Sequence, residues 1–247
     1  MESTHWWFTA KRAIVLSLLN RLIPRNSTSH PAVCDLGCGC GAMLFALKQA
    51  GYSAEGIDNN DNALGYCASR GVRARKGILP ELSGLEENSY DAVLMLDVLE
   101  HLADPKAGFA AALRLTKPSG YVICTLPAFQ WLWTQRDVFH HHNKRYNRRE
   151  LMELIRSSGP ISYTWVSYMN FFLFPLAFVE RLANQWFALR KTPKDLHLVP
   201  RPINALLGSI FASERHFLRS GIRFPYGLSL LGVVQKSVPD PNSQTSA

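Results

Sequence analysis

The feature that most constrains the fold is a continuous run of five apolar residues, Ala92-Val93-Leu94-Met95-Leu96. Such a run is typical of a strand buried on both faces, as in a parallel sheet. Further strand-like stretches lie at 32–34, 52–57, 72–76, 121–126, 161–167 and 229–236. Because most of them alternate with helical stretches, they are expected to form βαβ units. The sequence therefore predicts an α/β fold with a doubly wound, mostly parallel seven-stranded sheet.

The segments between these strands carry helix start and stop signals. Asn60 or Asp61 can cap a helix that ends before Gly71, and Asp104-Pro105 opens another. We expect a turn at 118–120, an N-terminal helix, and a helical insertion before the last strand. The expected helices span 13–23, 42–50, 61–70, 105–117, 148–158, 171–191 and 204–220.

The composition is that of a folded globular protein. Of the 247 residues, 47% are hydrophobic and 19% are charged, which excludes a disordered chain that buries too little apolar surface to fold. Five cysteines in this length exclude a disulfide-stapled mini-domain, and we expect reduced thiols. The formal net charge of +8 permits nucleic acid, anionic lipid or an acidic small substrate as a partner and selects none of them.

Neither a signal peptide nor a membrane-spanning segment is evident, so we expect a cytoplasmic protein. The most apolar stretch, 166–179, contains Asn170 and Pro175 and is shorter than the roughly 20 residues that a spanning helix needs. The stretches 171–191 and 204–220 carry apolar residues at helical spacing. They either pack on the domain or make peripheral contact with the inner face of a membrane.

A glycine-rich loop follows the first strand and precedes a helix. Gly37, Gly39 and Gly41 alternate, and Asp35 stands two residues before the first of them. Glycines let the backbone turn tightly and approach a ligand closely. Asp58, at the end of the second strand, can accept hydrogen bonds from both hydroxyls of a ribose. Because Asp35 suits an ammonium group better than a pyrophosphate, the pattern favours S-adenosylmethionine over a dinucleotide.

These motifs resemble the class I S-adenosylmethionine-dependent methyltransferases of the small-molecule type. The resemblance covers roughly residues 32–159 and includes 88–93, 97–102 and 115–120 as well as the glycine loop. It implies that S-adenosylmethionine contacts a set of residues at the carboxyl ends of the strands. Ile78 departs from the pattern, because many relatives carry an acid there that faces the adenine. The expected contacts are Asp35, Gly37, Gly39, Gly41, Asp58, Asn59, Ile78 and Asp97.

The resemblance also implies a division of the chain into parts. One methyltransferase domain is expected over 1–238. It comprises an N-terminal helix or lid at 1–31, a cofactor-binding core at 32–167 and a helical acceptor insertion at 168–227. The tail at 239–247 is expected to be disordered. The aromatic residues Trp6, Trp7 and Phe8 either form part of a lid or pack the N-terminal helix.

Candidate residues for chemistry on the acceptor follow the fourth and fifth strands. His101 and His141 are candidate catalytic bases, because imidazole titrates near neutral pH. The alternative for His101 is a histidine that hydrogen-bonds to the backbone at a turn. Trp131, Arg145 and Tyr146 are candidate substrate contacts, and the basic cluster 144–149 is either an anion site or a solvated loop. Cys34, Cys38 and Cys40 lack a second ligand pair at zinc spacing, so no metal is expected.

The function that we infer from the sequence is methyl transfer from S-adenosylmethionine to a small, lipophilic or anionic acceptor. Methyl transfer mainly requires the enzyme to align the acceptor with the activated methyl group. We therefore expect no invariant set of catalytic residues in the sequence. The alternatives are an NAD(P)-dependent oxidoreductase and a non-catalytic cofactor-binding scaffold. No separate RNA-binding module is evident, so nucleic acid is not an expected partner.

Overall fold

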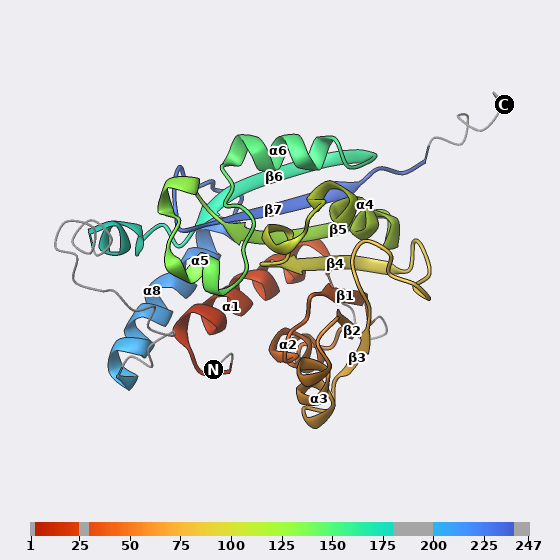
Figure 1. Ribbon diagram of the computed structural model, residues 1–247, viewed down its shortest axis with the longest axis horizontal. Helices are drawn as coiled ribbons and strands as arrows, with labels where there is room; N and C mark the ends of the chain where they lie inside the picture. Colours follow the sequence, from red (N-terminus) through yellow and green to blue (C-terminus); the bar gives the residue numbers. More distant parts are fainter. Residues whose placement is uncertain (1–2, 25–29, 180–199, 240–247) are drawn as a thin grey trace.

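A single sheet of seven strands organises the chain in this computed structural model, which describes residues 3–24, 30–179 and 200–239 (Figure 1). The strand order is β3-β2-β1-β4-β5-β7-β6. All neighbours are parallel except β7, which runs antiparallel to both β5 and β6. This arrangement confirms the predicted fold class. The strands are β1 (Ala32–Leu36), β2 (Ser53–Asp58), β3 (Arg73–Lys76), β4 (Tyr90–Leu96), β5 (Thr116–Pro127), β6 (Ile161–Met169) and β7 (Ser229–Lys236).

Helices cover both faces of the sheet. On one face α4 and α6 pack against each other, and on the other α1 packs on α2 and α8 (Figure 1). The described helices are α1 (Trp6–Leu22), α2 (Ala42–Gln49), α3 (Asp61–Ser69), α4 (Pro105–Leu115), α5 (Gln135–Phe139), α6 (Arg148–Arg156) and α8 (Arg201–Arg219), with short 3-10 helices η1 (Leu99–His101) and η2 (Gln130–Leu132).

Most predicted elements agree with the structure to within a few residues, and the differences have local causes. The N-terminal helix begins seven residues earlier than predicted, because the side chain of His5 accepts a hydrogen bond from the backbone of Trp7 and caps the helix there. Within the predicted helix 171–191, residues 174–179 are helical and 180–191 lie outside the described residues. The predicted disordered tail also lies outside them, apart from residue 239.

The segment 118–120, predicted as a turn, belongs to β5 instead. The strand begins at Thr116, and its pairing with β4 shifts register between Tyr90 and Ala92. The shift absorbs the extra residues as a bulge, in which Ser119 takes a left-handed conformation with a φ of 62°. The residues with turn propensity at this point therefore form an irregularity within β5 and do not separate the strand from the preceding helix.

Helices α1 and α8 form a closely packed pair. Phe211 of α8 is fully buried, and its ring lies 6.2 Å from that of Trp6 and 5.3 Å from that of Trp7. The side chain of Asn204 accepts a hydrogen bond of 2.9 Å from the backbone of Trp6. Trp6 and Trp7 therefore pack the N-terminal helix, which favours that alternative over a lid. No described helix is both long and apolar enough to cross a membrane.

Candidate functional site

The carboxyl ends of β1, β2 and β4 meet at one edge of the sheet, and the glycine loop 37–41 is bonded to this edge. The backbone N–H groups of Gly37 and Cys38 donate to the carbonyl of Ile57, at 2.8 and 3.1 Å. The N–H of Gly39 donates to a carboxylate oxygen of Asp58 at 2.8 Å, and Asn60 donates to the other oxygen at 2.9 Å. Asp58 thus links the loop to the end of β2 and orders both.

Glycine is required at two positions of this loop. Gly37 has a φ of 73° and Gly41 a φ of 77°, a region that other residues rarely adopt. A Cβ at Gly37 would also lie 2.6 Å from a methyl carbon of Val98, and one at Gly41 would lie 2.8 Å from the sulfur of Cys67. The backbone consequently approaches β4 and α3 more closely than any side chain would allow.

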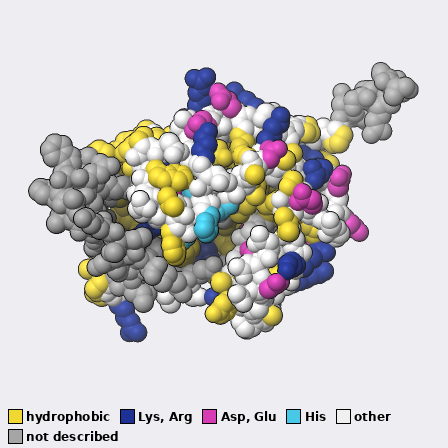
Figure 2. Space-filling model, viewed as in Figure 1, with side chains coloured by type: hydrophobic (Ala, Val, Ile, Leu, Met, Phe, Trp, Pro, Cys, Tyr) yellow, Lys and Arg dark blue, Asp and Glu magenta, His cyan; other side chains and the backbone are white. Residues whose placement is uncertain are grey.

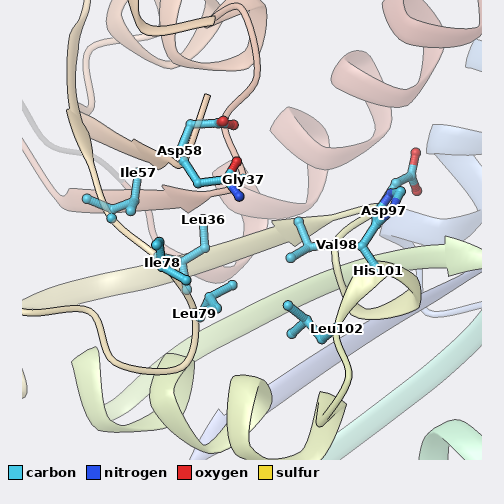
Figure 3. Close-up of a pocket in the computed structure, with 12 residues that line it drawn as sticks. Leu36, Gly37, Ile57, Asp58, Ile78, Leu79, Asp97, Val98, His101 and Leu102 are labelled. Atoms are coloured by element: carbon cyan, nitrogen blue, oxygen red, sulfur yellow. The ribbon is translucent and has the colours of Figure 1, made fainter. Parts of the chain in front are cut away.

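A cavity of about 310 Å³ opens beside the loop (Figure 3). Asp58 and Gly37 lie on one side of Val98, and Asp97 with His101 lies on the other (Figure 3). Most of the remaining wall is apolar. The lining residues are Leu36, Gly37, Ile57, Asp58, Asn59, Gly77, Ile78, Leu79, Asp97, Val98, His101 and Leu102.

Five of the eight predicted cofactor contacts line this cavity: Gly37, Asp58, Asn59, Ile78 and Asp97. Among the predicted catalytic residues, His101 lines it as well. Gly39 and Gly41 are not among the lining residues and shape the loop instead.

Asp35 lies in the interior rather than on the cavity wall. Its exposed fraction is 2%, and it is paired in register with Gly56 on one side and Leu94 on the other. Burial and then the negative charge of Asp35 raise the pKa of the Cys38 thiol. In this structure Asp35 is therefore a buried residue of the central strand β1, and its direct contact with an ammonium group stays a prediction.

Asp97 turns the chain out of β4 with a φ of 56° and is held by two partners. Thr125 donates a hydrogen bond of 2.8 Å, and the ammonium group of Lys11 forms an ion pair. Burial alone would raise the pKa of Asp97, but the charge and hydrogen bond of Lys11, together with Thr125, lower it. Asp97 thus presents an ionised carboxylate beside the cavity.

Lys11 is a site residue that sequence reasoning missed. Its exposed fraction is 6%, and it reaches Asp97 from α1. A signal was present in the sequence, because Lys11 stands on the same helical stripe as the buried residues Ile14, Val15 and Leu18. A cation on the apolar face of a helix needs a partner in the interior.

His101 and Glu100 lie on η1, directly after Asp97. Burial lowers the pKa of His101, and the neighbouring His142 lowers it further, so its imidazole favours the neutral form. Glu100 has an exposed fraction of 1%, and burial followed by the charge of Asp97 raises its pKa well above the usual range. Burial therefore favours the protonated form of this carboxyl.

The loop after α5 docks on η1 and brings a second histidine to His101. Asn143 donates from its backbone to the carbonyl of Glu100 at 2.7 Å and from its side chain to that of His101 at 3.0 Å. The ring of His142 meets that of His101 edge-on at 4.9 Å. His141, the predicted candidate, is exposed with a φ of 55°, so the structure does not bring its side chain into the site.

Arg145, a predicted substrate contact, is committed to a buried ion pair. Its guanidinium donates to both oxygens of Asp137, at 2.7 and 3.0 Å, and to the carbonyl of Ala128 at 3.2 Å. Asp137 also bonds to a ring nitrogen of His142 at 2.9 Å. Burial opposes ionisation, but these hydrogen bonds and the guanidinium charge hold the pKa of Asp137 well below its usual range. Arg145 therefore holds Asp137 in place, and its guanidinium is not available to an anionic acceptor.

The other two predicted substrate contacts are placed differently. Tyr146 has an exposed fraction of 4% and forms a backbone bridge with Ala128, and burial raises its pKa to about 12. Trp131 is exposed by 56% and stacks on Phe129 at 5.4 Å. Neither lines the cavity, and Trp131 belongs to an aromatic surface next to it.

One group of described residues brings atoms of metal-ligating type together. Suitable atoms of Glu100, His101 and His142 all lie within 4.8 Å of one another. A cation would have to share His142 with Asp137, and burial disfavours the ionised carboxylate of Glu100 that would bind it. The group is thus poorly prepared for a hard cation, which prefers ionised oxygen ligands. The sequence prediction that no metal is bound stays a prediction.

Comparison with known families identifies the family to which the chain belongs. A family profile described as a methyltransferase domain matches residues 7–160. The chain belongs to this methyltransferase family. The match includes the glycine loop, Asp58, the turn after β4 and the loop that carries His142. It confirms the resemblance to class I S-adenosylmethionine-dependent methyltransferases.

Curated relatives of this methyltransferase domain include two ubiquinone biosynthesis O-methyltransferases. That of Methylococcus capsulatus is 32% identical over 128 residues, which cover 47% of this chain and 54% of the relative. That of Saccharophagus degradans is 28% identical over 159 residues, which cover 57% and 67%. The chain therefore spans about half to two thirds of the length of these relatives.

Solved structures share the fold of this methyltransferase domain. A methyltransferase from Archaeoglobus fulgidus superposes with a TM-score of 0.58 at 18% identity, covering 91% of this chain and 94% of that one. Phosphoethanolamine N-methyltransferase 2 of Haemonchus contortus, in complex with S-adenosyl-L-methionine, gives 0.59 at 19%, covering 90% and 52%. At these identities the likeness concerns the fold alone.

Proposed function

We propose that this chain transfers a methyl group from S-adenosylmethionine to a hydroxyl oxygen of a small, lipophilic acceptor. The observation that carries the proposal is the cavity at the carboxyl edge, where the glycine loop faces Asp97 and His101. When bound, S-adenosylmethionine supplies a methyl group that is already activated by the sulfonium charge. The protein then has to hold the nucleoside, align the acceptor and receive a proton.

The residues of the cavity suit this nucleoside. Asp58 retains acceptor capacity for a ribose hydroxyl while it holds Gly39, because a carboxylate has several lone-pair sites. Ile57, Ile78 and Leu79 form an apolar wall suited to a purine ring. Gly37 is exposed and lines the cavity, so its backbone is open to the amino-acid part of the ligand.

The same lining argues against the oxidoreductase alternative. Its charged groups are the carboxylates of Asp58 and Asp97, and no lysine or arginine is among the lining residues. A dinucleotide would bring a doubly charged pyrophosphate into a cavity whose lining holds no lysine or arginine to neutralise it. A cationic sulfonium needs no such partner.

The acceptor side favours a lipophilic molecule over an anionic one. Arg145 is neutralised by Asp137, and Lys144 by Glu150 at 2.7 Å, so the basic cluster holds less free positive charge than its sequence suggests. Aromatic rings gather nearby: Phe129 stacks on Tyr168 at 4.9 Å, and Trp131 meets Phe178 at 5.8 Å. Such rings accommodate another flat ring. The names of the ubiquinone O-methyltransferase relatives support a ring hydroxyl as the acceptor.

Calorimetry and a turnover assay test the proposal. We expect the protein to bind S-adenosylhomocysteine and not NADH, and to methylate an alkylated catechol when given S-adenosylmethionine. Binding of NADH without binding of S-adenosylhomocysteine would contradict the assigned cofactor. Binding of S-adenosylhomocysteine without turnover of any acceptor in a panel of phenols, carboxylates and amines would favour the non-catalytic scaffold.

A further inference from the structure

His142 occupies a protected position at the rim of the candidate site. Its side chain is exposed by 15%, and its ring packs edge-on against His101, which lines the cavity. Histidine side chains gather in the middle of this face of the molecule, beside a hollow (Figure 2). His142 also lies close enough to Asp97 for its charge to lower the pKa of that carboxyl. The imidazole is not itself a lining residue of the cavity but is in contact with one, His101.

The hydrogen bonds of Asp137 fix which ring nitrogen of His142 carries a proton. Asp137 accepts from the backbone and hydroxyl of Thr134, at 2.7 and 3.0 Å, and from the guanidinium of Arg145. All of these partners donate, and the carboxylate is ionised. The contact with Nδ1 of His142 at 2.9 Å therefore requires Nδ1 to donate as well. The neutral ring then carries its free lone pair on Nε2.

The surrounding structure holds this arrangement rigidly. The backbone N–H of His142 donates to the carbonyl of Asp137 at 2.9 Å, and Asn143 anchors the loop to Glu100. Asp137 itself is 1% exposed and closes a capping box with Thr134 at the start of α5. One carboxylate thus orients a helix terminus, a buried guanidinium and the imidazole together.

We propose that His142 is the proton acceptor of the reaction and that Asp137 is its positioning residue. This inference rests on the proposed function. The hydroxyl proton of the acceptor passes to Nε2 of His142, and the oxygen forms its new bond to the methyl carbon. The carbon–sulfur bond breaks with its electron pair on sulfur, which leaves a neutral thioether. The resulting imidazolium faces the charge of Asp137 until it returns the proton to water.

His142 suits this role better than His101. The charged form of His101 is disfavoured by burial and by the neighbouring imidazole of His142, although the charge of Asp97 and a hydrogen bond with the backbone of His141 partly offset these effects. His142, in contrast, has an ionised carboxylate in direct contact. A carboxylate in direct contact fixes the tautomer and the orientation of an imidazole that accepts a proton.

Nitrogen NMR of the protein without ligands tests the proposed tautomer. We expect the Nε2 resonance of His142 to be that of an unprotonated nitrogen, with the proton on Nδ1. In Asp137→Asn the amide no longer provides an anionic acceptor, so the preference for this tautomer weakens or reverses. A wild-type ring with its proton on Nε2 overturns the proposal, whatever the enzyme's activity.

Kinetics test the chemical role. We expect His142→Asn to lower kcat by about 10²- to 10⁴-fold while the KM of the catechol and the affinity for S-adenosylhomocysteine change by no more than about threefold. His30→Gln, at the opposite edge of the sheet, is the matched control and should retain wild-type kcat. Because Asp137→Asn can also disturb folding, His142→Asn is the deciding variant.

The outcomes separate this inference from the proposed function. Wild-type turnover by His142→Asn overturns the role of His142 and leaves the proposed function intact, whereas failure of the wild type to bind S-adenosylhomocysteine overturns the proposed function. Loss of activity in His141→Asn but not in His142→Asn would overturn the role of His142 and return it to His141, one of the two residues predicted from the sequence. A stoichiometric divalent ion in the wild type that His142→Asn loses would identify His142 as a ligand and overturn the proposal.

Discussion

Asp58 is the residue on which the proposed cofactor site depends most directly. Its two oxygens order the glycine loop through Gly39 and the start of α3 through Asn60. We expect Asp58→Ala to weaken the binding of S-adenosylhomocysteine by about 1–3 kcal/mol in calorimetry, because loop and ribose both lose a partner. Asp61→Ala, which removes only an exposed ion pair with Lys76, should leave the affinity unchanged. Equal affinities for wild type and Asp58→Ala would refute the assignment.

Lys11 and Asp97 form a pair whose strength depends on pH. We expect Lys11→Met to lower the free energy of unfolding by about 1–3 kcal/mol at pH 7, and Asp97→Asn in the same chain to recover part of it. Because Lys11 helps to lower the pKa of Asp97, this stabilisation is present above the unfolded pKa of a carboxyl. It is lost as the pH falls through the lowered folded value. Urea titrations of the single and double variants at pH 7 and pH 3 check this, and a loss as large at pH 3 as at pH 7 would contradict the ion-pair explanation.

The position of a residue at the carboxyl edge of the sheet was predictable where it depends only on the distance from the end of a strand. Gly37 and Asp58 follow strands at fixed distances, so their place at the carboxyl edge could be read from the chain. The choice between His141 and His142 could not. His141 adopts a left-handed backbone conformation, which changes the direction in which the neighbouring side chains point. Nothing in the sequence indicates that this histidine adopts such a conformation. The ion pair of Arg145 with Asp137 was not predicted either. Asp137 lies on the short helix α5, which the sequence did not indicate.

At the scale of elements, the junction between β6 and α8 is held by one buried acid. The carboxyl of Glu214 on α8 accepts hydrogen bonds from the backbone of Asn170 at 2.7 Å and Phe172 at 3.0 Å. Burial raises its pKa to about 7, although these hydrogen bonds favour the charged form. The folded protein therefore binds a proton here at a pH where the unfolded chain does not.

This proton makes a specific contribution to stability. Because the folded pKa lies above the unfolded one, the contribution is complete below about pH 4.5 and is lost as the pH rises to about 7. We expect it to be on the order of 3 kcal/mol and to be absent in Glu214→Gln. The measurement is the free energy of unfolding from urea titrations between pH 4.5 and pH 8. Glu153→Gln, an exposed residue of α6, should keep the wild-type slope, and an unchanged slope in Glu214→Gln would contradict the assignment.

The boundaries of the helices and strands show which of them can be predicted from the local sequence and which cannot. Helix α4 begins at the proline that follows Asp104, as its cap predicts, and Asn147 caps α6 in the same way. The start of β5 was missed because pairing with β4 extends the strand through residues with turn propensity. Local signals thus place helix ends well, whereas strand ends depend on neighbours that are distant in the sequence.

At the scale of the whole molecule, exposed apolar side chains collect on the segment 172–179 and on α8. Leu176 is exposed by 62% and Leu206 by 60%, and basic side chains such as Arg201 and Arg219 lie on the same helix as Leu206. With a formal net charge of +8, such a surface suits contact with anionic lipid. We propose that the predicted membrane contact involves these residues, which would bring the protein to a lipophilic acceptor.

Vesicle flotation checks this proposal. We expect the protein to float with vesicles of anionic phospholipid, less so as salt is raised, and not with neutral vesicles. Leu176→Ser and Leu206→Ser together should reduce flotation several-fold. Tyr66→Ser, which removes an exposed aromatic residue of α3, is the control and should float like the wild type. No flotation on anionic vesicles would leave the two segments as ordinary packing surfaces.

The insertion of β7 between β5 and β6 has a consequence for how the protein is made. β7 is the last described strand along the chain, yet it pairs with both neighbours through buried residues such as Leu230 and Val234. While the ribosome is still producing the segment before Ser229, β6 has no partner in the sheet. The edge of β5 that will pair with β7 is also still free. The nascent chain therefore holds a gap in its sheet until translation of this strand, and during that interval it presents two unpaired edges to chaperones and to other chains.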